Sequence, residues 1–146
     1  MDIYGILRKE HQEVISLIEK QVLDIKAGRS DAGLVERIQK VYFIHMGAEE
    51  KFFYPLLEDR EDMYVRVITS YEEHHTAKEI LKNIRNMMTD DGRRLARLRF
   101  AKELIENHIE AEEKIFRMAE KILNKDAAQE ISRRFLEERE LLLDTS

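Results

Sequence analysis

Two short segments of this sequence carry the same pair of chemically active side chains. His45 precedes Glu49 by four residues, His108 precedes Glu112 by four, and both copies contain the tetrapeptide Ala-Glu-Glu-Lys. On an α-helix, residues i and i+4 lie one turn apart on the same face. Each copy therefore directs one imidazole and one carboxylate toward the same side of a helix.

The repeat includes two further histidines, each preceded by a glutamate: Glu10-His11 and Glu73-His74. The separation is 63 residues both from position 11 to 74 and from position 45 to 108. Two helical hairpins with a common ancestor explain this register. Two hairpins that must place the same atoms at the same depth explain it equally well.

Helical periodicity places six polar side chains inside the apolar stripes of the predicted helices. They are His11, His45, Glu49, His74, His108 and Glu112. A lone core histidine is usually only hydrogen-bonded, and an i, i+4 His/Glu pair is commonly a surface ion pair. Two buried carboxylates, however, cost several kcal/mol each unless they are compensated, and the inner stripes hold no Lys or Arg. A pair of metal cations would offset this cost.

The six side chains offer only nitrogen and oxygen donors, and the chain has no cysteine. This donor set favours iron or manganese, tolerates zinc, and disfavours copper(I) and iron–sulfur clusters. Six donors are too many for one tetrahedral zinc ion. They suit two metals that are bridged by both carboxylates and bound by two imidazoles each, with positions left for water, dioxygen or nitric oxide.

The apolar stripes predict four long helices joined by short turns: about 2–27, from a Ser30 cap to about 56 with a kink at Pro55, about 63–88, and about 91–124. Short turns force antiparallel neighbours, so the predicted fold class is all-α, an up-down-up-down four-helix bundle. A short extra C-terminal helix, about 127–143, has no counterpart in the repeat. We expect it to lie against the bundle or against a dimer partner. The prediction is a single domain over 1–146.

Composition limits the classes of function. The chain has 146 residues, 38% of them charged and 43% hydrophobic, with a net charge of −5. The net negative charge predicts no basic surface for binding nucleic acid or an anionic membrane. No apolar run approaches the ~20 residues that span a bilayer, and residues 1–4 lack the features of a signal peptide. We therefore expect a cytoplasmic protein.

The ordered set Glu10-His11, His45-x-x-x-Glu49, Glu73-His74 and His108-x-x-x-Glu112 resembles the haemerythrin-like HHE cation-binding domains. The run from Glu49 to Pro55 is also similar to the acidic-aromatic-proline segment of that family. The resemblance covers about residues 2–124. It implies a non-haem diiron site, oxo- or hydroxo-bridged, that binds dioxygen, nitric oxide or a related small ligand in sensing, storage or stress response. A diiron enzyme (a ferroxidase, a peroxidase-like activity or iron-centre repair) is the alternative.

Oxygen-carrying members of that family have a fifth histidine one turn from another on the third helix. Ser70 and Lys78 occupy the positions one turn either side of His74, so this ligand is missing. Those members also have a longer His-to-carboxylate spacing on the fourth helix than His108 to Glu112. Both departures argue against reversible oxygen carriage.

Other features leave alternatives open. His75 competes with His74 for the ligand role, but it shares its face with charged residues and lies off the repeat register. Tyr42 and Tyr71 each lie three residues before a ligand histidine, where they are core aromatics or hydrogen-bonding partners of the site. A third possible function is a structural or zinc-loaded bundle that acts through its fifth helix and a partner. A homodimer through the C-terminal helix is a separate expectation.

Overall fold

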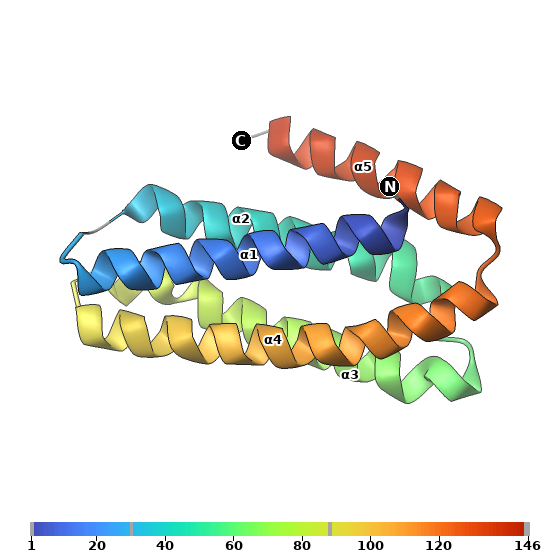
Figure 1. The fold of residues 1–146 in the computed structure, drawn as a ribbon, viewed down its shortest axis with the longest axis horizontal. Helices are drawn as coiled ribbons and strands as arrows, with labels where there is room; N and C mark the ends of the chain where they lie inside the picture. The colour runs from blue at the N-terminus through green and yellow to red at the C-terminus, as the bar shows by residue number, and fades with distance from the viewer. Residues whose placement is uncertain (1, 30, 88, 145–146) are drawn as a thin grey trace.

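The computed structural model describes residues 2–29, 31–87 and 89–144, and within these ranges all regular structure is helical. The long helices are α1 (Ile3–Lys26), α2 (Ala32–Ala48), α3 (Glu61–Lys82), α4 (Asp91–Ile122) and α5 (Lys125–Asp144). Helices α1 to α4 form an antiparallel bundle in which α1 lies beside α2 and α4, and α3 lies beside α4 (Figure 1). The predicted up-down-up-down bundle is confirmed.

Aspartate side chains begin three of the helices. Asp2, Asp31 and Asp90 each accept a hydrogen bond from the backbone N–H three residues later, which satisfies a free donor of the first turn. The predicted Ser30 cap lies outside the described residues, and Asp31 has this role. Gly28, with φ of +76°, ends the α1 turn in the left-handed conformation that glycine adopts without strain.

The second helix departs from α-helical geometry before the predicted kink at Pro55. It ends at Ala48 and continues as a π-helical turn, Glu49–Phe53, and then as a 3-10 turn, Tyr54–Leu56. The backbone N–H of Tyr54 bonds to the carbonyl of Glu49, five residues earlier. The π turn therefore accommodates one extra residue, and it places Tyr54 above Glu49 on the inner face.

The third helix is shorter than predicted. α3 ends at Lys82 and a 3-10 turn, Ile84–Met87, completes the hairpin, while the predicted end at Met88 lies outside the described residues. Asn83, which ends α3, bonds through its side-chain amide to the Glu79 carbonyl and so competes with regular helical bonding.

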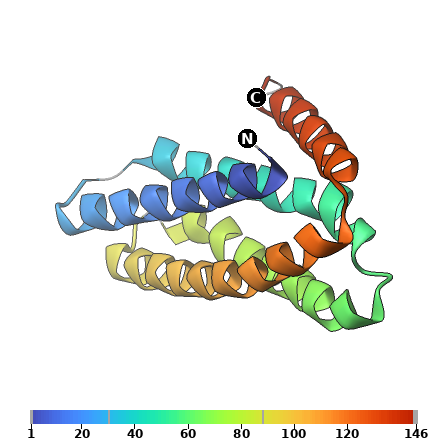
Figure 2. The ribbon, with the colours of Figure 1, turned by 45° about the vertical axis from the view of Figure 1, so that its right-hand side comes forward.

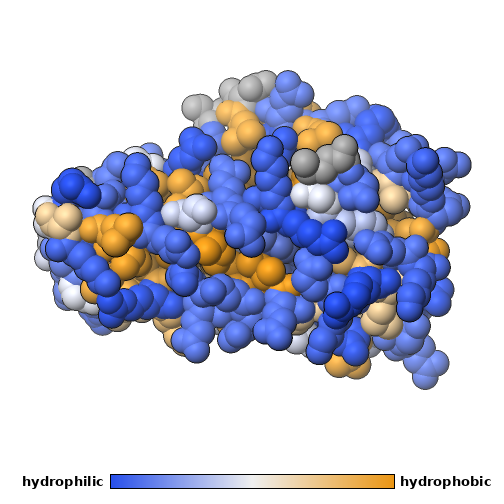
Figure 3. All heavy atoms as spheres, viewed as in Figure 1, coloured by the Kyte–Doolittle hydropathy of each residue, from blue (hydrophilic) through white to orange (hydrophobic). Residues whose placement is uncertain are grey.

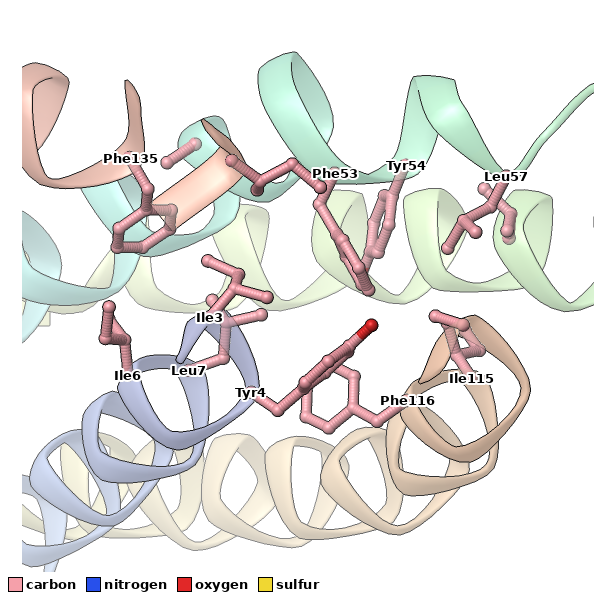
Figure 4. Close-up of a cluster of buried hydrophobic side chains, with 14 of the residues drawn as sticks. Ile3, Tyr4, Ile6, Leu7, Phe53, Tyr54, Leu57, Ile115, Phe116 and Phe135 are labelled. Carbon is pink, nitrogen blue, oxygen red and sulfur yellow. The ribbon is translucent and has the colours of Figure 1, made fainter. Parts of the chain in front are cut away.

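The apolar core forms two clusters, one toward each end of the bundle. Figure 4 shows the cluster at the end where α5 begins, in which the rings of Tyr4, Phe53 and Phe116 lie with their centroids 5.6 to 6.1 Å apart. The second cluster fills the opposite end and includes Ile18, Ile38 and the neighbouring aliphatic side chains. The six polar side chains lie between these two clusters.

Helix α5 turns back over the bundle and contacts α1, α2 and the π turn, as the rotated view in Figure 2 shows. Phe135 and Ile131 of α5 are buried in the first cluster. Of the two predicted arrangements for the fifth helix, the structure shows packing on its own bundle. The face drawn in Figure 3 is mainly hydrophilic, with hydrophobic groups in separate small patches. Within the described residues, no helix combines the length and apolarity needed to cross a bilayer.

Candidate metal centre

The structure brings the six predicted side chains together in the middle of the bundle. None of them is more than 2% exposed. α1 supplies one histidine, α2 one, α3 one, and α4 one histidine with one glutamate, while Glu49 comes from the π turn. Each helix thus reaches the same level from a different side, as the repeat register predicts.

The six residues form two overlapping groups that share both glutamates. The first group is His11, His45, Glu49 and Glu112, and the second is Glu49, His74, His108 and Glu112. Within each group, one donor atom from every residue lies within 4.8 Å of the others.

Each shared carboxylate faces one histidine of each group. Nε2 of His45 lies 2.8 Å from Oε1 of Glu49, and Nε2 of His74 lies 3.4 Å from the same oxygen. Nε2 of His11 lies 3.0 Å from Oε1 of Glu112, and Nε2 of His108 lies 3.2 Å from Oε2. Residues grouped in this way could hold metal cations between them.

Several of these nitrogen and oxygen atoms lie close together but are not oriented to form hydrogen bonds with one another. Nε2 of His11 and of His45, both carboxylate oxygens of Glu49 and Oε1 of Glu112 are buried without a hydrogen-bond partner among the described residues. Buried polar atoms are nearly always satisfied, so five unsatisfied atoms in one place need an explanation. They belong to the two residue groups that share both glutamates, and this donor set fits cations.

In the metal-free centre, protonated histidines balance the negative charges of the buried carboxylates. Burial lowers the pKa of His45, but the Glu49 charge and the Glu10 hydrogen bond outweigh it and raise that pKa to about 10. His108 likewise has a pKa of about 10, because burial is outweighed by the charge of Glu112. Burial raises the pKa of Glu112, but the His108 charge holds it well below its ordinary value. Protons therefore occupy the place that metal cations would take.

Three carboxylates outside the six orient the imidazoles through their other ring nitrogens. Nδ1 of His45 lies 2.8 Å from Glu10, and Nδ1 of His108 lies 3.0 Å from Glu73. Both pairs span 35 residues, so the glutamate before each first histidine of the repeat holds the second histidine of that repeat. Such partners fix the ring orientation and make a ligand nitrogen more basic.

The third outer carboxylate breaks the symmetry of the repeat. Nδ1 of His74 lies 3.0 Å from Glu50. The counterpart of Glu50 in the other half is Glu113, but its carboxylate is held by Arg8 at 2.9 Å. Nδ1 of His11 is buried without a partner among the described residues. The two halves of the centre are therefore chemically different.

Tyr54 adds a hydroxyl group to the centre. It donates a hydrogen bond to Oε2 of Glu112 and lies 3.3 Å from Nε2 of His74. Burial, followed by the charge of Glu112, raises the pKa of Tyr54 well above its ordinary value, so this group is a neutral donor in the metal-free protein. Sequence periodicity missed Tyr54 because an uninterrupted α-helix places it off the face of Glu49.

Helix α5 also reaches the centre. Nη1 of Arg139 lies 2.6 Å from Oε2 of Glu10, whose other oxygen contacts His45. The Phe135 ring packs edge-on against the His45 ring, with centroids 6.4 Å apart. The helix without a counterpart in the repeat thus supports one of the six side chains.

The structure also separates the alternatives that the sequence left open. His74 is buried in the centre, and His75 is exposed. Tyr42 stacks on His45, with centroids 5.8 Å apart, as a packing role predicts. The Tyr71 hydroxyl donates to Glu58 at 3.2 Å and to a backbone carbonyl, and not to any of the six side chains.

An all-helical bundle with buried histidines and carboxylates at its centre defines the general class of this protein. The family model described as hemerythrin HHE cation binding domain matches residues 2–119, and the chain belongs to this family. Searches among curated proteins and among solved structures found no match. Together, the family and the buried His/Glu cluster indicate metal binding.

Proposed function

We propose that this protein holds two iron ions and binds dioxygen, nitric oxide or a related small ligand, in sensing, storage or stress response. The ligands are His11, His45, His74 and His108, with Glu49 and Glu112 as bridges. The observation that carries the proposal is that the two ligand groups share both glutamates. An iron pair would supply coordination positions that the six side chains leave open to a small ligand.

Iron suits the donor set better than the other candidates. Four imidazoles and two carboxylates, without a thiolate, are typical ligands of iron and manganese, and zinc remains possible. The two apolar clusters on either side of the centre limit access of water, which favours a small ligand over a bulky one.

The visible spectrum tests this function. Protein expressed with added iron should show absorption bands of a ferric pair, and these bands should change on addition of azide, because the anion would take an open position. A spectrum without such bands in protein that contains iron would contradict the proposed site. Absorption bands that do not change on addition of azide would contradict the proposed open coordination position.

A diiron enzyme is the second candidate, and Tyr54 favours it. The phenol lies beside His74 and Glu112, where it can donate a hydrogen bond or a proton to a bound substrate. Consumption of hydrogen peroxide by the iron-loaded protein, and its loss in Tyr54→Phe, would support this function. A rate no greater than that of free iron would exclude peroxide as the substrate.

A further inference from the structure

A groove lies between α1, α2 and α5, on the outer side of the metal centre. Its volume is about 670 Å³, within the range of roughly 300–1,000 Å³ that is typical of small-molecule sites. In Figures 1 and 2, α5 runs back over the α1–α2 pair. The groove is lined by Ile6, Lys9, Glu10, Glu13, Arg37, Lys40, Val41, Ile44, Leu136, Arg139 and Leu143.

The lining combines an apolar part with a cationic one. Ile6, Val41, Ile44 and Leu136 give aliphatic surface from all three helices, and Leu136 is 38% exposed. Aliphatic surface without aromatic rings suits a flexible hydrocarbon chain. Each methylene group buried on such a surface strengthens binding about fourfold.

The charges of the groove are unbalanced toward the positive. Four cationic side chains line it against two carboxylates, although the whole chain has a net charge of −5. Glu10 is already bound by His45 and Arg139, and Glu13 lies 3.4 Å from Arg37. The carboxylates are therefore neutralised from within the protein.

Two lysines remain without a carboxylate partner. Within the described residues, Lys9 has no ion pair, and Lys40 donates only to the backbone carbonyl of Leu143, at 3.3 Å. An ammonium group that lines an apolar groove attracts an anion, and the nearby low-dielectric surface strengthens this attraction.

We propose that this groove binds a small single-chain amphiphile with a carboxylate head group, such as a medium-chain fatty acid. The head group contacts Lys9 and Lys40, and the hydrocarbon chain lies along Ile6, Val41 and Ile44. The occupant is a free molecule, because the groove is a concave site of small-molecule size and the net charge of the protein disfavours an anionic membrane surface.

The position of the groove connects it to the metal centre. Glu10 is 6% exposed, lines the groove and holds His45 in place, and Arg139 lines the groove and holds Glu10. An occupant therefore lies against the side chains that orient one predicted ligand.

The test is calorimetric titration of decanoate into the full chain, with hexanoate, acetate and decanol as comparison ligands. Decanoate should bind with one molecule per chain and at least tenfold more tightly than hexanoate or decanol, while acetate should show no saturable binding. This series separates a site for an amphiphile from a site for an anion alone. The titration needs no metal, so its result is independent of the proposed iron site.

Two variants and a matched control locate the site. Lys9→Ala with Lys40→Ala should weaken decanoate binding at least tenfold, and Val41→Trp should abolish it by filling the groove. Lys20→Ala with Lys26→Ala removes the same charge from exposed positions of α1 outside the groove and should leave binding unchanged. Circular dichroism shows that each variant is folded.

Three outcomes would overturn the proposal. They are the absence of saturable decanoate binding, equal binding by the Lys9/Lys40 variant and the control, and binding to anionic phospholipid vesicles without binding to monomeric decanoate.

Discussion

The hydroxyl group of Tyr54 donates a hydrogen bond to the carboxylate of Glu112, a residue 58 positions later in the chain. The bond exists because the π turn after α2 rotates Tyr54 onto the inner face of the bundle. π turns often occur at functional sites, where they redirect a side chain without breaking the helix. Here, the turn brings a neutral donor to one of the two shared carboxylates.

Removal of this donor should destabilise the metal-free protein. Tyr54→Phe leaves a buried carboxylate oxygen with one partner fewer, so the free energy of unfolding in urea should fall by about 1.5–3 kcal/mol. Tyr64→Phe, at a position 53% exposed, is the matched control and should change it by less than about 0.5 kcal/mol. Equal losses in both variants would mean that the Tyr54 bond contributes nothing specific.

Two adjacent glutamates should differ sharply in their effect on metal content. Glu112 is fully buried in the centre, whereas Glu113 pairs with Arg8 near the surface. Glu112→Ala should lose most of its metal because both ions lose a bridging ligand, and Glu113→Ala should keep it. Elemental analysis of the purified variants measures this. Metal lost from Glu113→Ala and kept by Glu112→Ala would mean that the helical phase of the proposed ligands is wrong.

The carboxylates behind the histidines should control metal affinity. Glu73→Gln weakens the acceptor at Nδ1 of His108 and makes that imidazole a poorer ligand, so metal affinity should fall about 10–100-fold. Glu72→Gln changes the same group one position earlier, where the side chain is exposed, and serves as the control. Competition with a coloured chelator gives both affinities. If the two variants release metal alike, Glu73 has no positioning role.

Protonation should stabilise the metal-free protein at low pH and not at high pH. The pKa values of His45 and His108 are raised from 6.5 to about 10, so this contribution is complete below pH 6.5 and is lost as the pH rises toward 10. Glu112, with its lowered pKa, contributes above its ordinary value of 4.5, and that contribution is lost at lower pH.

Urea unfolding at a series of pH values measures this dependence. The free energy of unfolding of the metal-free protein should be greatest between about pH 4.5 and 6.5 and should fall toward about pH 9.5. The metal-loaded protein should lack the decline on the alkaline side, because cations replace the protons. A metal-free protein that is more stable at about pH 9.5 than at about pH 6.5 would contradict the assigned charges.

The sequence predicts the bundle and the positions of the six central side chains because both follow from periodicity. Apolar residues at helical spacing define the inner faces, and the repeat places His11 and His74 at equivalent depths. The glutamate before each of these histidines recurs with the repeat, so the sequence shows Glu10 and Glu73 as a pattern but does not indicate their role.

The sequence does not predict the π turn, Tyr54 or the Arg139 contact. These features depend on local helix geometry or on tertiary packing. A π turn differs from an α-helix by one residue, and no periodic signal marks its position, so helical periodicity does not place Tyr54 in the site. Proline indicated a break near Pro55, but the geometry changes already at Glu49. The contact of Arg139 with Glu10 joins residues 129 positions apart and depends on how α5 packs, which helical phase alone does not determine.

Anomalous diffraction at the iron absorption edge, from crystals of the iron-loaded protein, tests the central claim most directly. The account predicts two iron peaks between the four helices, one beside His11 and His45 and one beside His74 and His108, with Glu49 and Glu112 contacting both. A single peak, iron bound elsewhere on the chain, or glutamates turned away from the metal would contradict it.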